Sequence, residues 1–257
     1  MALLFFQKTI FTPLYGLNSR CLGRTWTVQT YKYETHAHTS ESSNCSRISA
    51  ADLVEFYWQS GFSGVCITDH LDYFLKGWAS VPADAPWVER VEQFCKGYEN
   101  ALIVGMKLGI DVFFGWEHSE RSAHFLTFGL DKQWLLDHPD LLDLSFREYC
   151  DLVRSDGGFI VHAHPFRIDQ WIHEICLYPQ EVDAVEVINA CRTDFQNQCA
   201  DQYADNFGLL KIAGSDNHQG RLERLAGIKV PRRLVDVHDM ISAIKNGQAE
   251  CFLESLP

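Results

Sequence analysis

Short runs of β-forming residues alternate with helix-forming runs along most of this chain, and this alternation restricts the possible folds more than any other feature. Seven runs are rich in Val, Ile, Phe and Thr, a composition typical of strands. These predicted strands cover residues 28–36, 64–68, 112–116, 124–129, 159–162, 184–189 and 210–213. Helices are predicted at 49–60, 86–109, 145–154, 196–207 and 237–246.

Such an alternation is typical of parallel strands that are joined by right-handed crossovers. The chain has 257 residues, enough for one large domain, and seven such strands favour an α/β barrel that is closed or nearly closed. In these barrels the functional residues lie at the carboxyl ends of the strands, so we expect the site at that end.

Charge and apolar content exclude several functions. The chain carries 22 basic and 34 acidic residues, a net charge of −12, so we expect no duplex nucleic acid as a partner. No stretch approaches 18 consecutive apolar residues, so we expect no membrane partner. The nine cysteines form no Cys-x-x-Cys pair and indicate reduced thiols in a cytoplasmic protein. The sequence gives no indication of the oligomeric state.

The beginning of the chain differs in charge from the rest. Residues 1–33 contain Lys8, Arg20, Arg24 and Lys32 but no acidic residue. We therefore expect an N-terminal extension at 1–25, with a targeting segment as the alternative, and a barrel domain at 26–257.

Histidine or a carboxylate occurs at the end of nearly every predicted strand. His36 and His38 follow the first strand, His70 the second, Glu117 and His118 the third, His162 and His164 the fifth, and Asp216 and His218 the seventh, while His124 opens the fourth. Residues two apart in an extended chain point to the same side, so each pair can face one point. Ordinary packing gives no reason for this recurrence, which predicts a metal centre.

Imidazole nitrogen and carboxylate oxygen together suit Zn, Mn or Fe. The set is too large for one tetrahedral ion, and Glu117 could bridge two ions about 3.5–4 Å apart, as in phosphoryl chemistry. His118 is expected on the opposite side of the strand from its neighbour Glu117. We expect His138, His173 and His238 to be surface or packing residues.

Six short motifs carry most of these residues, in one order along the chain. They are His36-Ala37-His38-Thr39, Thr68-Asp69-His70, Gly115-Trp116-Glu117, His124-Phe125-Leu126, Ala163-His164-Pro165 and Gly214-Ser215-Asp216-Asn217-His218. They resemble the successive motifs of the PHP (polymerase and histidinol phosphatase) superfamily. The resemblance implies a distorted (β/α)7 barrel, two or three divalent metal ions (Zn, Mn or Fe) at the carboxyl ends of the strands, and hydrolysis of phosphoesters.

The resemblance also implies metal ligands. In it, His36, His38, Glu117 and Asp216 hold one metal, Glu117 bridges to a second metal with His124 and His164, and His70 and His218 hold a third. A further ligand usually follows the first pair of histidines by seven or eight residues. Here Ser43 and Asn44 occupy those positions, followed by Cys45, which could contribute a thiolate. The third site could therefore be weak, completed by water, or empty.

Other residues near these motifs have candidate catalytic or binding roles. With a metal-activated water as nucleophile, Glu117 and Asp216 serve catalysis as ligands, and Asp69 could orient a ligand or shuttle a proton. Arg167 and Arg192 are candidates for binding phosphate, with surface ion pairs as the alternative. His162 matches no ligand of the family and is a candidate substrate contact, with packing as its alternative.

The sequence leaves three functions open. The first is a metal-dependent phosphatase or phosphodiesterase for a small phosphorylated metabolite, such as histidinol phosphate or a nucleotide. The second is an exonuclease or nucleotidase that acts on the ends of nucleic acids. The third is a non-catalytic module that metal ions stabilise.

Overall fold

The computed structural model describes residues 29–71, 82, 84–170 and 172–256. The predicted extension at 1–25 lies outside these residues, so it stays a prediction. Among the described residues, no helix is both long and apolar enough to cross a membrane.

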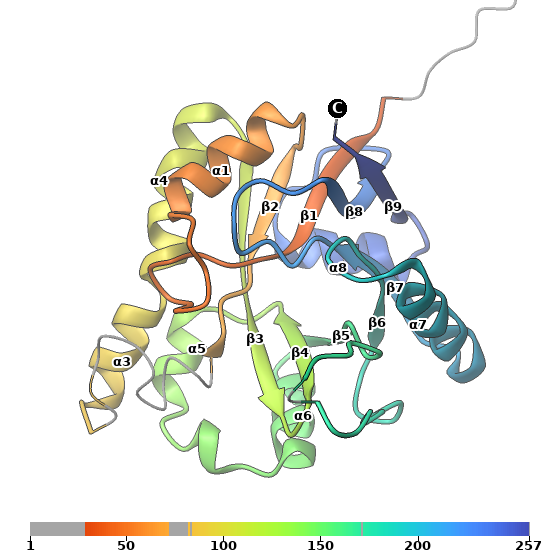
Figure 1. Ribbon diagram of the computed structural model, residues 1–257. Coiled ribbons are helices and arrows are strands. Elements are labelled where there is room, and N and C mark those ends of the chain that lie inside the picture. Colours follow the sequence, from red (N-terminus) through yellow and green to blue (C-terminus); the bar gives the residue numbers. More distant parts are fainter. Residues whose placement is uncertain (1–28, 72–81, 83, 171, 257) are drawn as a thin grey trace, which may run out of the picture.

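One strongly curved sheet of nine strands forms the centre of the molecule (Figure 1). In space the strands run in the order β7-β6-β5-β4-β3-β2-β1-β8-β9. Their bounds are β1 Tyr31–Ala37, β2 Gly64–Ile67, β3 Asp111–Glu120, β4 Ala123–Phe128, β5 Phe159–Ala163, β6 Ala184–Asn189, β7 Leu210–Gly214, β8 Arg224–Val230 and β9 Glu250–Ser255. The α/β barrel class is confirmed, but the (β/α)7 count is not.

The sheet is mixed rather than wholly parallel, which corrects the expectation of parallel strands throughout. Strands β1, β2 and β3 are parallel, as are β5, β6 and β7, but β4 runs antiparallel to both of its neighbours. The reason is the short connection between Glu120 and Ala123, which pair directly across the β3–β4 ladder. Two residues can join only antiparallel strands, because a parallel crossover needs about a dozen.

The two ends of the parallel array meet, so the sheet nearly closes. The amide of Asp216 donates to the carbonyl of His36 at 2.8 Å, and the amide of His38 donates to the carbonyl of Asn217 at 3.0 Å. These bonds join the chain after β7 to the end of β1. Strands β8 and β9 continue antiparallel from the same edge of β1, the edge that does not pair with β2.

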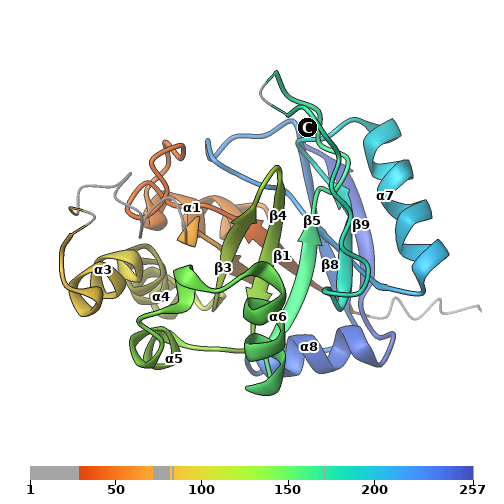
Figure 2. The same ribbon diagram turned by 90° about the horizontal axis from the view of Figure 1, so that it is seen from below.

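Helices surround the curved sheet on its outer side (Figure 2). They are α1 Ala50–Gln59, α3 Trp87–Phe94, α4 Lys96–Leu108, α5 Lys132–Asp137, α6 Phe146–Ser155, α7 Asp194–Phe207 and α8 Val237–Lys245, with a 3₁₀ turn at Leu141–Asp143. Ser49 and Ser145 are the N-cap residues of α1 and α6. The side chain of each accepts a hydrogen bond from a backbone N–H of its helix, as expected at this position. The single helix predicted at 86–109 is instead two helices that meet at Cys95.

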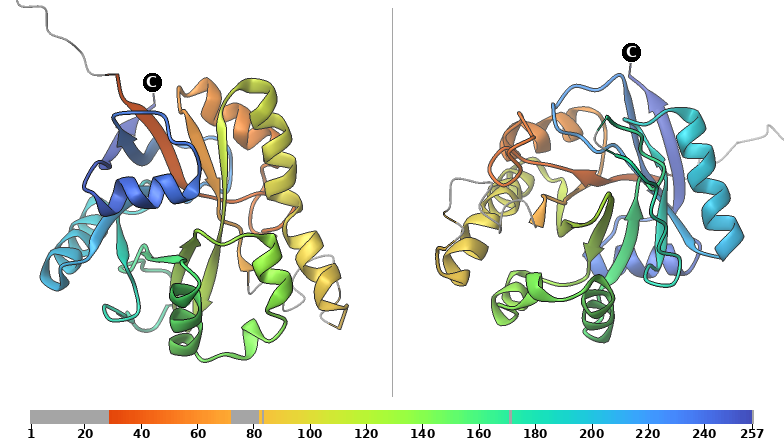
Figure 3. Two further views of the ribbon diagram at one scale, coloured as in Figure 1. Left: turned by 180° about the vertical axis from the view of Figure 1, so that it is seen from behind. Right: turned by 60° about the horizontal axis from the view of Figure 1, so that its bottom comes forward.

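Helix α8 covers one end of the barrel (Figure 3). Its buried residues Met240, Ile241 and Ile244 pack with Phe159 at the start of β5 and Phe128 at the end of β4. This is the end at which the parallel strands begin. Their carboxyl ends lie at the opposite end of the barrel, where the candidate site is found.

Candidate metal centre

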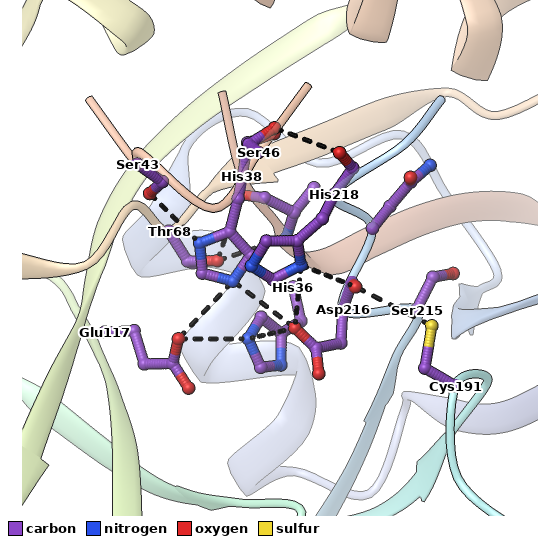
Figure 4. A network of polar contacts seen from close by, with 12 residues as sticks. His36, His38, Ser43, Ser46, Thr68, Glu117, Cys191, Ser215, Asp216 and His218 are labelled. Carbon is purple, nitrogen blue, oxygen red and sulfur yellow. Dashed lines mark hydrogen bonds and ion pairs between the residues drawn. The ribbon is translucent and has the colours of Figure 1, made fainter. Parts of the chain in front are cut away.

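Eight histidine and carboxylate side chains meet at the carboxyl end of the parallel strands. They are His36 of β1, His38 after it, His70 after β2, Glu117 of β3, His124 of β4, His164 after β5, and Asp216 and His218 after β7. Seven are buried and His218 is partly exposed. Figure 4 shows His36, His38, Glu117, Asp216 and His218 turned toward one another.

The reversed direction of β4 explains why a residue at a strand start joins this set. Because β4 is antiparallel to β3 and β5, its first residues lie beside the last residues of its neighbours. His124 is thus brought to Glu117, and its Nδ1 lies 2.8 Å from Glu117 Oε1. Glu117 itself lies inside β3, which continues to Glu120, and does not follow the strand as the sequence suggested.

Glu117 is the hub of the cluster. Its Oε1 lies 2.8 Å from His124 and 3.3 Å from His164 Nε2. Its Oε2 lies 2.9 Å from His70 Nδ1, 3.4 Å from His38 Nε2 and 3.6 Å from His36 Nε2. A carboxylate with separate partners on its two oxygens has the geometry required to bridge two cations.

Ligand atoms in the cluster fall into four overlapping groups, each with its members within 4.8 Å of one another. The groups are His36, His38 and Glu117; His36, His164 and Asp216; His70, Glu117 and His124; and His38, His70 and His218. His164 is therefore grouped with His36 and Asp216, and His70 with Glu117 and His124, whereas the family resemblance divides them differently.

Several donor atoms of the cluster fit a metal because they have no other role. The Nε2 atoms of His36, His38 and His164 and the Oε2 of Glu117 are buried and make no hydrogen bond within the described part of the chain. Buried polar atoms without partners are rare, because each carries a desolvation cost. Divalent cations would satisfy these atoms, and the mixed imidazole and carboxylate donor set suits Zn, Mn or Fe.

Charge within the cluster is balanced between imidazoles and carboxylates. Burial alone would raise the pKa of Glu117, but the positive charges of His70, His124 and His36 hold it well below its usual value. Burial lowers the pKa of His38 well below its usual value, and His218 and His70 lower it further. The neutral imidazole and the ionised carboxylate are the forms that bind metals.

Glu186 on β6 contacts two histidines of the cluster, His36 and His164. It was not identified from the sequence. Its Oε1 lies 2.9 Å from Nδ1 of His36, and its Oε2 accepts bonds from the amide of His164 and the side chain of Asn189, both at 2.9 Å. A carboxylate on the second ring nitrogen fixes the orientation of a metal-binding histidine. The signal in the sequence was an acidic residue inside an otherwise apolar strand.

Two of the cluster residues adopt strained backbone conformations. His164 has φ 29° and Asp216 has φ 56°, values that side chains other than glycine rarely adopt. Such strain is found mostly at functional sites, where the surrounding structure maintains it. Here the bonds from His164 to Glu186 and from Asp216 to the carbonyl of His36 hold both residues in place.

Both predicted arginines lie beside the cluster. Arg192 Nη2 lies 3.2 Å from Asp216 Oδ2, and Arg167 Nε lies 3.4 Å from Asp169 Oδ2. Arg167 also lines a cavity of about 290 Å³. The other residues lining this cavity are Arg121, Ser122, His124, Ile172, His173 and Glu174. The cavity thus joins a cluster histidine to two arginines, of which Arg121 is paired with Glu174.

Asp69 is buried beside the first histidine motif. It accepts hydrogen bonds from the amide and hydroxyl of Thr39, both at 2.7 Å, and from the hydroxyl of Ser43 at 2.6 Å. Burial raises its pKa to about 6 despite these bonds. Of its two predicted roles, this geometry favours orientation of the chain around the ligands over proton transfer.

His162 and His118 lie among aromatic rings. The ring of His162 is buried and stacks on Phe125 at a centroid distance of 4.8 Å. The ring of His118 stacks on Tyr149 at 4.2 Å. For His162 these surroundings favour packing over the other predicted role, a substrate contact. His118 lies apart from Glu117, as expected.

Comparison with known proteins identifies the fold. Neither a family model nor a curated protein sequence matches the chain. A two-domain protein from Bacteroides vulgatus that contains a predicted PHP-like metal-dependent phosphoesterase aligns with a TM-score of 0.66 and 18% identity, over 87% of this chain and 65% of that protein. The chain thus spans less than two thirds of this neighbour.

Two further structures share the fold. A protein from Bifidobacterium adolescentis assigned as a metal-dependent phosphoesterase aligns with a TM-score of 0.53 and 16% identity, over 82% of this chain and 94% of that one. A lesion-specific endonuclease from Pyrococcus furiosus aligns with a TM-score of 0.54 and 14% identity, over 89% of this chain and 60% of that one. The resemblance seen in the sequence motifs is thus confirmed at the level of the fold.

Proposed function

We propose that this chain, which has the fold of the PHP-like phosphoesterases, is itself a metal-dependent phosphoesterase that acts on a small phosphorylated molecule. The observation that carries the proposal is the meeting of eight ligand side chains, several with buried donor atoms that lack any hydrogen bond. Six of the eight are histidines, which suits transition-metal ions better than magnesium.

The groups of ligand atoms indicate where two ions would bind. His36, His164 and Asp216 would hold one, and His70 and His124 would hold the other, with Glu117 between them. Bound divalent ions would lower the pKa of a coordinated water toward 7 and neutralise phosphate oxygens.

Around these ligands, the arginines would position the phosphate. Arg192 lies against Asp216, and Arg167 lies in the wall of the adjacent cavity, so each guanidinium can reach an anion at the cluster. Guanidinium and phosphate match in geometry and can form two hydrogen bonds. Phosphoryl transfer depends mainly on such positioning and charge stabilisation, so no nucleophile from the protein is needed.

A small substrate fits the dimensions and charge of the site. The cavity beside His124 has a volume of about 290 Å³, near the lower limit for ligand pockets. The chain has a net charge of −12, which disfavours a long polyanion. The second candidate is action on a nucleic-acid end. One structural neighbour does cut nucleic acid, which favours a nucleic-acid substrate, although an endonuclease cuts within a strand and not at its end.

The test combines metal analysis with a phosphoester screen of the purified protein. We expect at least two transition-metal ions per chain and hydrolysis of p-nitrophenyl phosphate or its bis-ester. His36→Ala and Asp216→Ala should lose metal and activity together, while His238→Ala, an exposed histidine on α8, should keep both. Comparing a nucleotide with a single-stranded oligonucleotide separates the two candidate substrates.

One result would contradict the proposal. A protein that holds its metals but hydrolyses no ester in a broad panel would instead be a metal-stabilised structural module.

A further inference from the structure

The two arginines beside the cluster are held by rigid turns that follow two neighbouring strands, β5 and β6. The amide of Arg167 donates to the carbonyl of His164 at 2.9 Å, and the amide of Arg192 donates to the carbonyl of Asn189 at 3.1 Å. The Nη2 of Arg224 also donates to the carbonyl of Arg192. The backbone therefore fixes the place from which each guanidinium extends.

Each of these guanidiniums has a buried donor that is not used. The side chains of Arg167 and Arg192 are 15% and 19% exposed. The Nε atom of each is buried and makes no hydrogen bond to any residue that the structure describes. Arginine keeps its proton in proteins, and an unpaired buried donor carries a desolvation cost. Both side chains can therefore still bind an anion.

Asp169 lies between the two guanidiniums. Its Oδ2 lies 3.4 Å from Arg167 Nε and 3.8 Å from Arg192 Nη1. Both distances exceed the length of a hydrogen bond, about 2.7–3.2 Å, so the carboxylate balances the charge of the arginines without satisfying their donors. The side chain of Asp169 is 30% exposed, so it can turn toward solvent without crossing the core.

Arg192 places this carboxylate next to the candidate metal centre. Its Nη2 lies 3.2 Å from Oδ2 of Asp216, while its Nη1 is on the side of Asp169. One guanidinium therefore separates the carboxylate of Asp169 from a residue of the cluster. Arg167 lines the cavity that also includes His124. An anion that binds both arginines would thus lie beside the metal centre.

We propose that the carboxylate of Asp169 occupies the phosphate position between Arg167 and Arg192 until a substrate displaces it. The inference rests on the proposed function and adds an internal competitor to it. A phosphate group can form two hydrogen bonds with a guanidinium and has oxygens for both arginines. At pH 7 a phosphate monoester carries a charge of about −1.5 to −2, more than a carboxylate does, so it attracts the arginines more strongly.

A competitor of this kind weakens substrate binding without changing the chemical step. The carboxylate leaves when the substrate binds, so it contacts the arginines neither in the bound complex nor in the transition state. Its removal should therefore lower KM and leave kcat unchanged. A residue that positions the arginines would behave in the opposite way, because its loss would raise KM.

Asp169→Asn tests the inference in the metal-loaded protein. The substitution removes the charge but keeps the size, so we expect KM for p-nitrophenyl phosphate to fall about two- to fivefold at constant kcat, as for the loss of a partly exposed ion pair. The dissociation constant of inorganic phosphate, measured by calorimetry, should fall by a similar factor. Asp169→Glu retains a carboxylate and should bind phosphate like the wild type.

Asp140→Asn is the matched control. Asp140 is exposed and directly precedes the 3₁₀ turn at Leu141–Asp143. Its substitution removes the same charge from a different part of the chain and so measures the effect of net charge alone. We expect its KM and its phosphate affinity to match those of the wild type.

Three outcomes overturn the inference. They are a KM and a phosphate affinity that Asp169→Asn leaves unchanged, a KM that rises in this variant, and an equal fall of KM in Asp140→Asn. A protein that hydrolyses no ester contradicts the proposed function instead, and the phosphate titration then still decides whether Asp169 competes for the arginines. A protein that binds no phosphate at all refutes both.

Discussion

At the scale of single residues, the cluster depends on how each histidine ring is oriented. His36 has one nitrogen on Glu186 and the other directed at Glu117 and Asp216. Burial disfavours the charged imidazole, but Glu186, Asp216 and Glu117 outweigh it and raise the pKa of His36 well above its usual value. The carboxylates thus attract positive charge to Nε2, and a divalent cation supplies it as well as a proton does.

Replacing Glu186 with glutamine tests this orientation. Glu186→Gln removes the charge behind His36 but keeps the volume, so we expect metal affinity to fall about 10–100-fold with the fold retained. Titration with a competing chelator measures the affinity. Glu250→Gln, an exposed carboxylate on β9, is the control and should bind metal like the wild type. Unchanged affinity in Glu186→Gln would show that the residue does not position the ligand.

The meeting of these histidines and carboxylates at one end of the barrel could be predicted from sequence, whereas the residues that support them could not. His36 and His38 are recognisable because residues two apart at a strand end share a side, and this holds whatever the rest of the chain does. The contact of Glu186 with His36 depends on how β6 and β7 lie against β1, which no local pattern encodes.

At the scale of elements, the sequence predicted seven strands and missed two. The seven predicted strands contain runs of apolar β-branched and aromatic residues, a pattern that a short stretch of sequence is enough to show. Strand β8 contains Ala226 and Gly227 at its centre, and β9 has Glu250 and Glu254 near its two ends, so neither has that pattern. Gly227 is required there because a Cβ would collide with the backbone of Tyr33 on β1. The direction of β4 also depends on a connection too short for a crossover.

Substitution of Gly214, at the end of β7, tests whether the close approach of β7 to β1 matters for stability and for the site. A Cβ there would lie 2.5 Å from the Cβ of His36 and 2.8 Å from Glu186 Oε1. We expect Gly214→Ala to lower the free energy of unfolding by about 1–3 kcal/mol in urea titrations, because the strands must separate. Metal affinity should fall as well.

Gly157→Ala is the matched control for this substitution. Gly157 has φ 88° and open space around it, so the change adds backbone strain of about 1 kcal/mol without a clash near His36. It should leave metal affinity unchanged. Equal effects of the two variants on metal affinity would show that the approach of β7 to β1 does not matter for the site.

Helix α8, which covers the other end of the barrel, gives a pH-dependent prediction. Hydrogen bonds from Arg232 and from the amide of Val235 lower the pKa of Asp239 to about 2. A carboxyl whose pKa is depressed on folding stabilises the protein above its unfolded pKa of about 3.9, and this contribution disappears as the pH falls toward 2.

We therefore expect Asp239→Asn to lose less than about 1 kcal/mol of stability at neutral pH, since the pair is near the surface. Urea titrations at several pH values should show the difference from wild type shrinking below pH of about 4. A difference that grows as the pH falls would contradict the assigned ion pair.

At the scale of the whole molecule, an acidic chain concentrates six of its 11 histidines at one end of a barrel. The eight side chains of the cluster span positions 36 to 218 and come together only because the sheet curls until β7 meets β1. The net charge of −12 repels anions in general, so a phosphate would bind only where cations and arginines reverse the local charge. Closure of the barrel and binding of metal should therefore be coupled.

Chelation tests that coupling. A ligand present at about 100 times its Kd stabilises the folded state by about 2.7 kcal/mol, so removing metal should lower Tm by roughly 5 to 10 °C. Thermal unfolding with and without chelator measures the change. His36→Ala should show little change on chelation, while His238→Ala should behave like the wild type. If the chelator leaves the Tm of the wild type unchanged, no metal stabilises this fold.

The most direct measurement is anomalous diffraction from crystals of the metal-loaded protein, collected on either side of the absorption edge of the bound metal. The account predicts at least two anomalous peaks, one among His36, His164 and Asp216 and one among His70, Glu117 and His124. Crystals with no anomalous peak between these residues, or with peaks only elsewhere on the molecule, would contradict it.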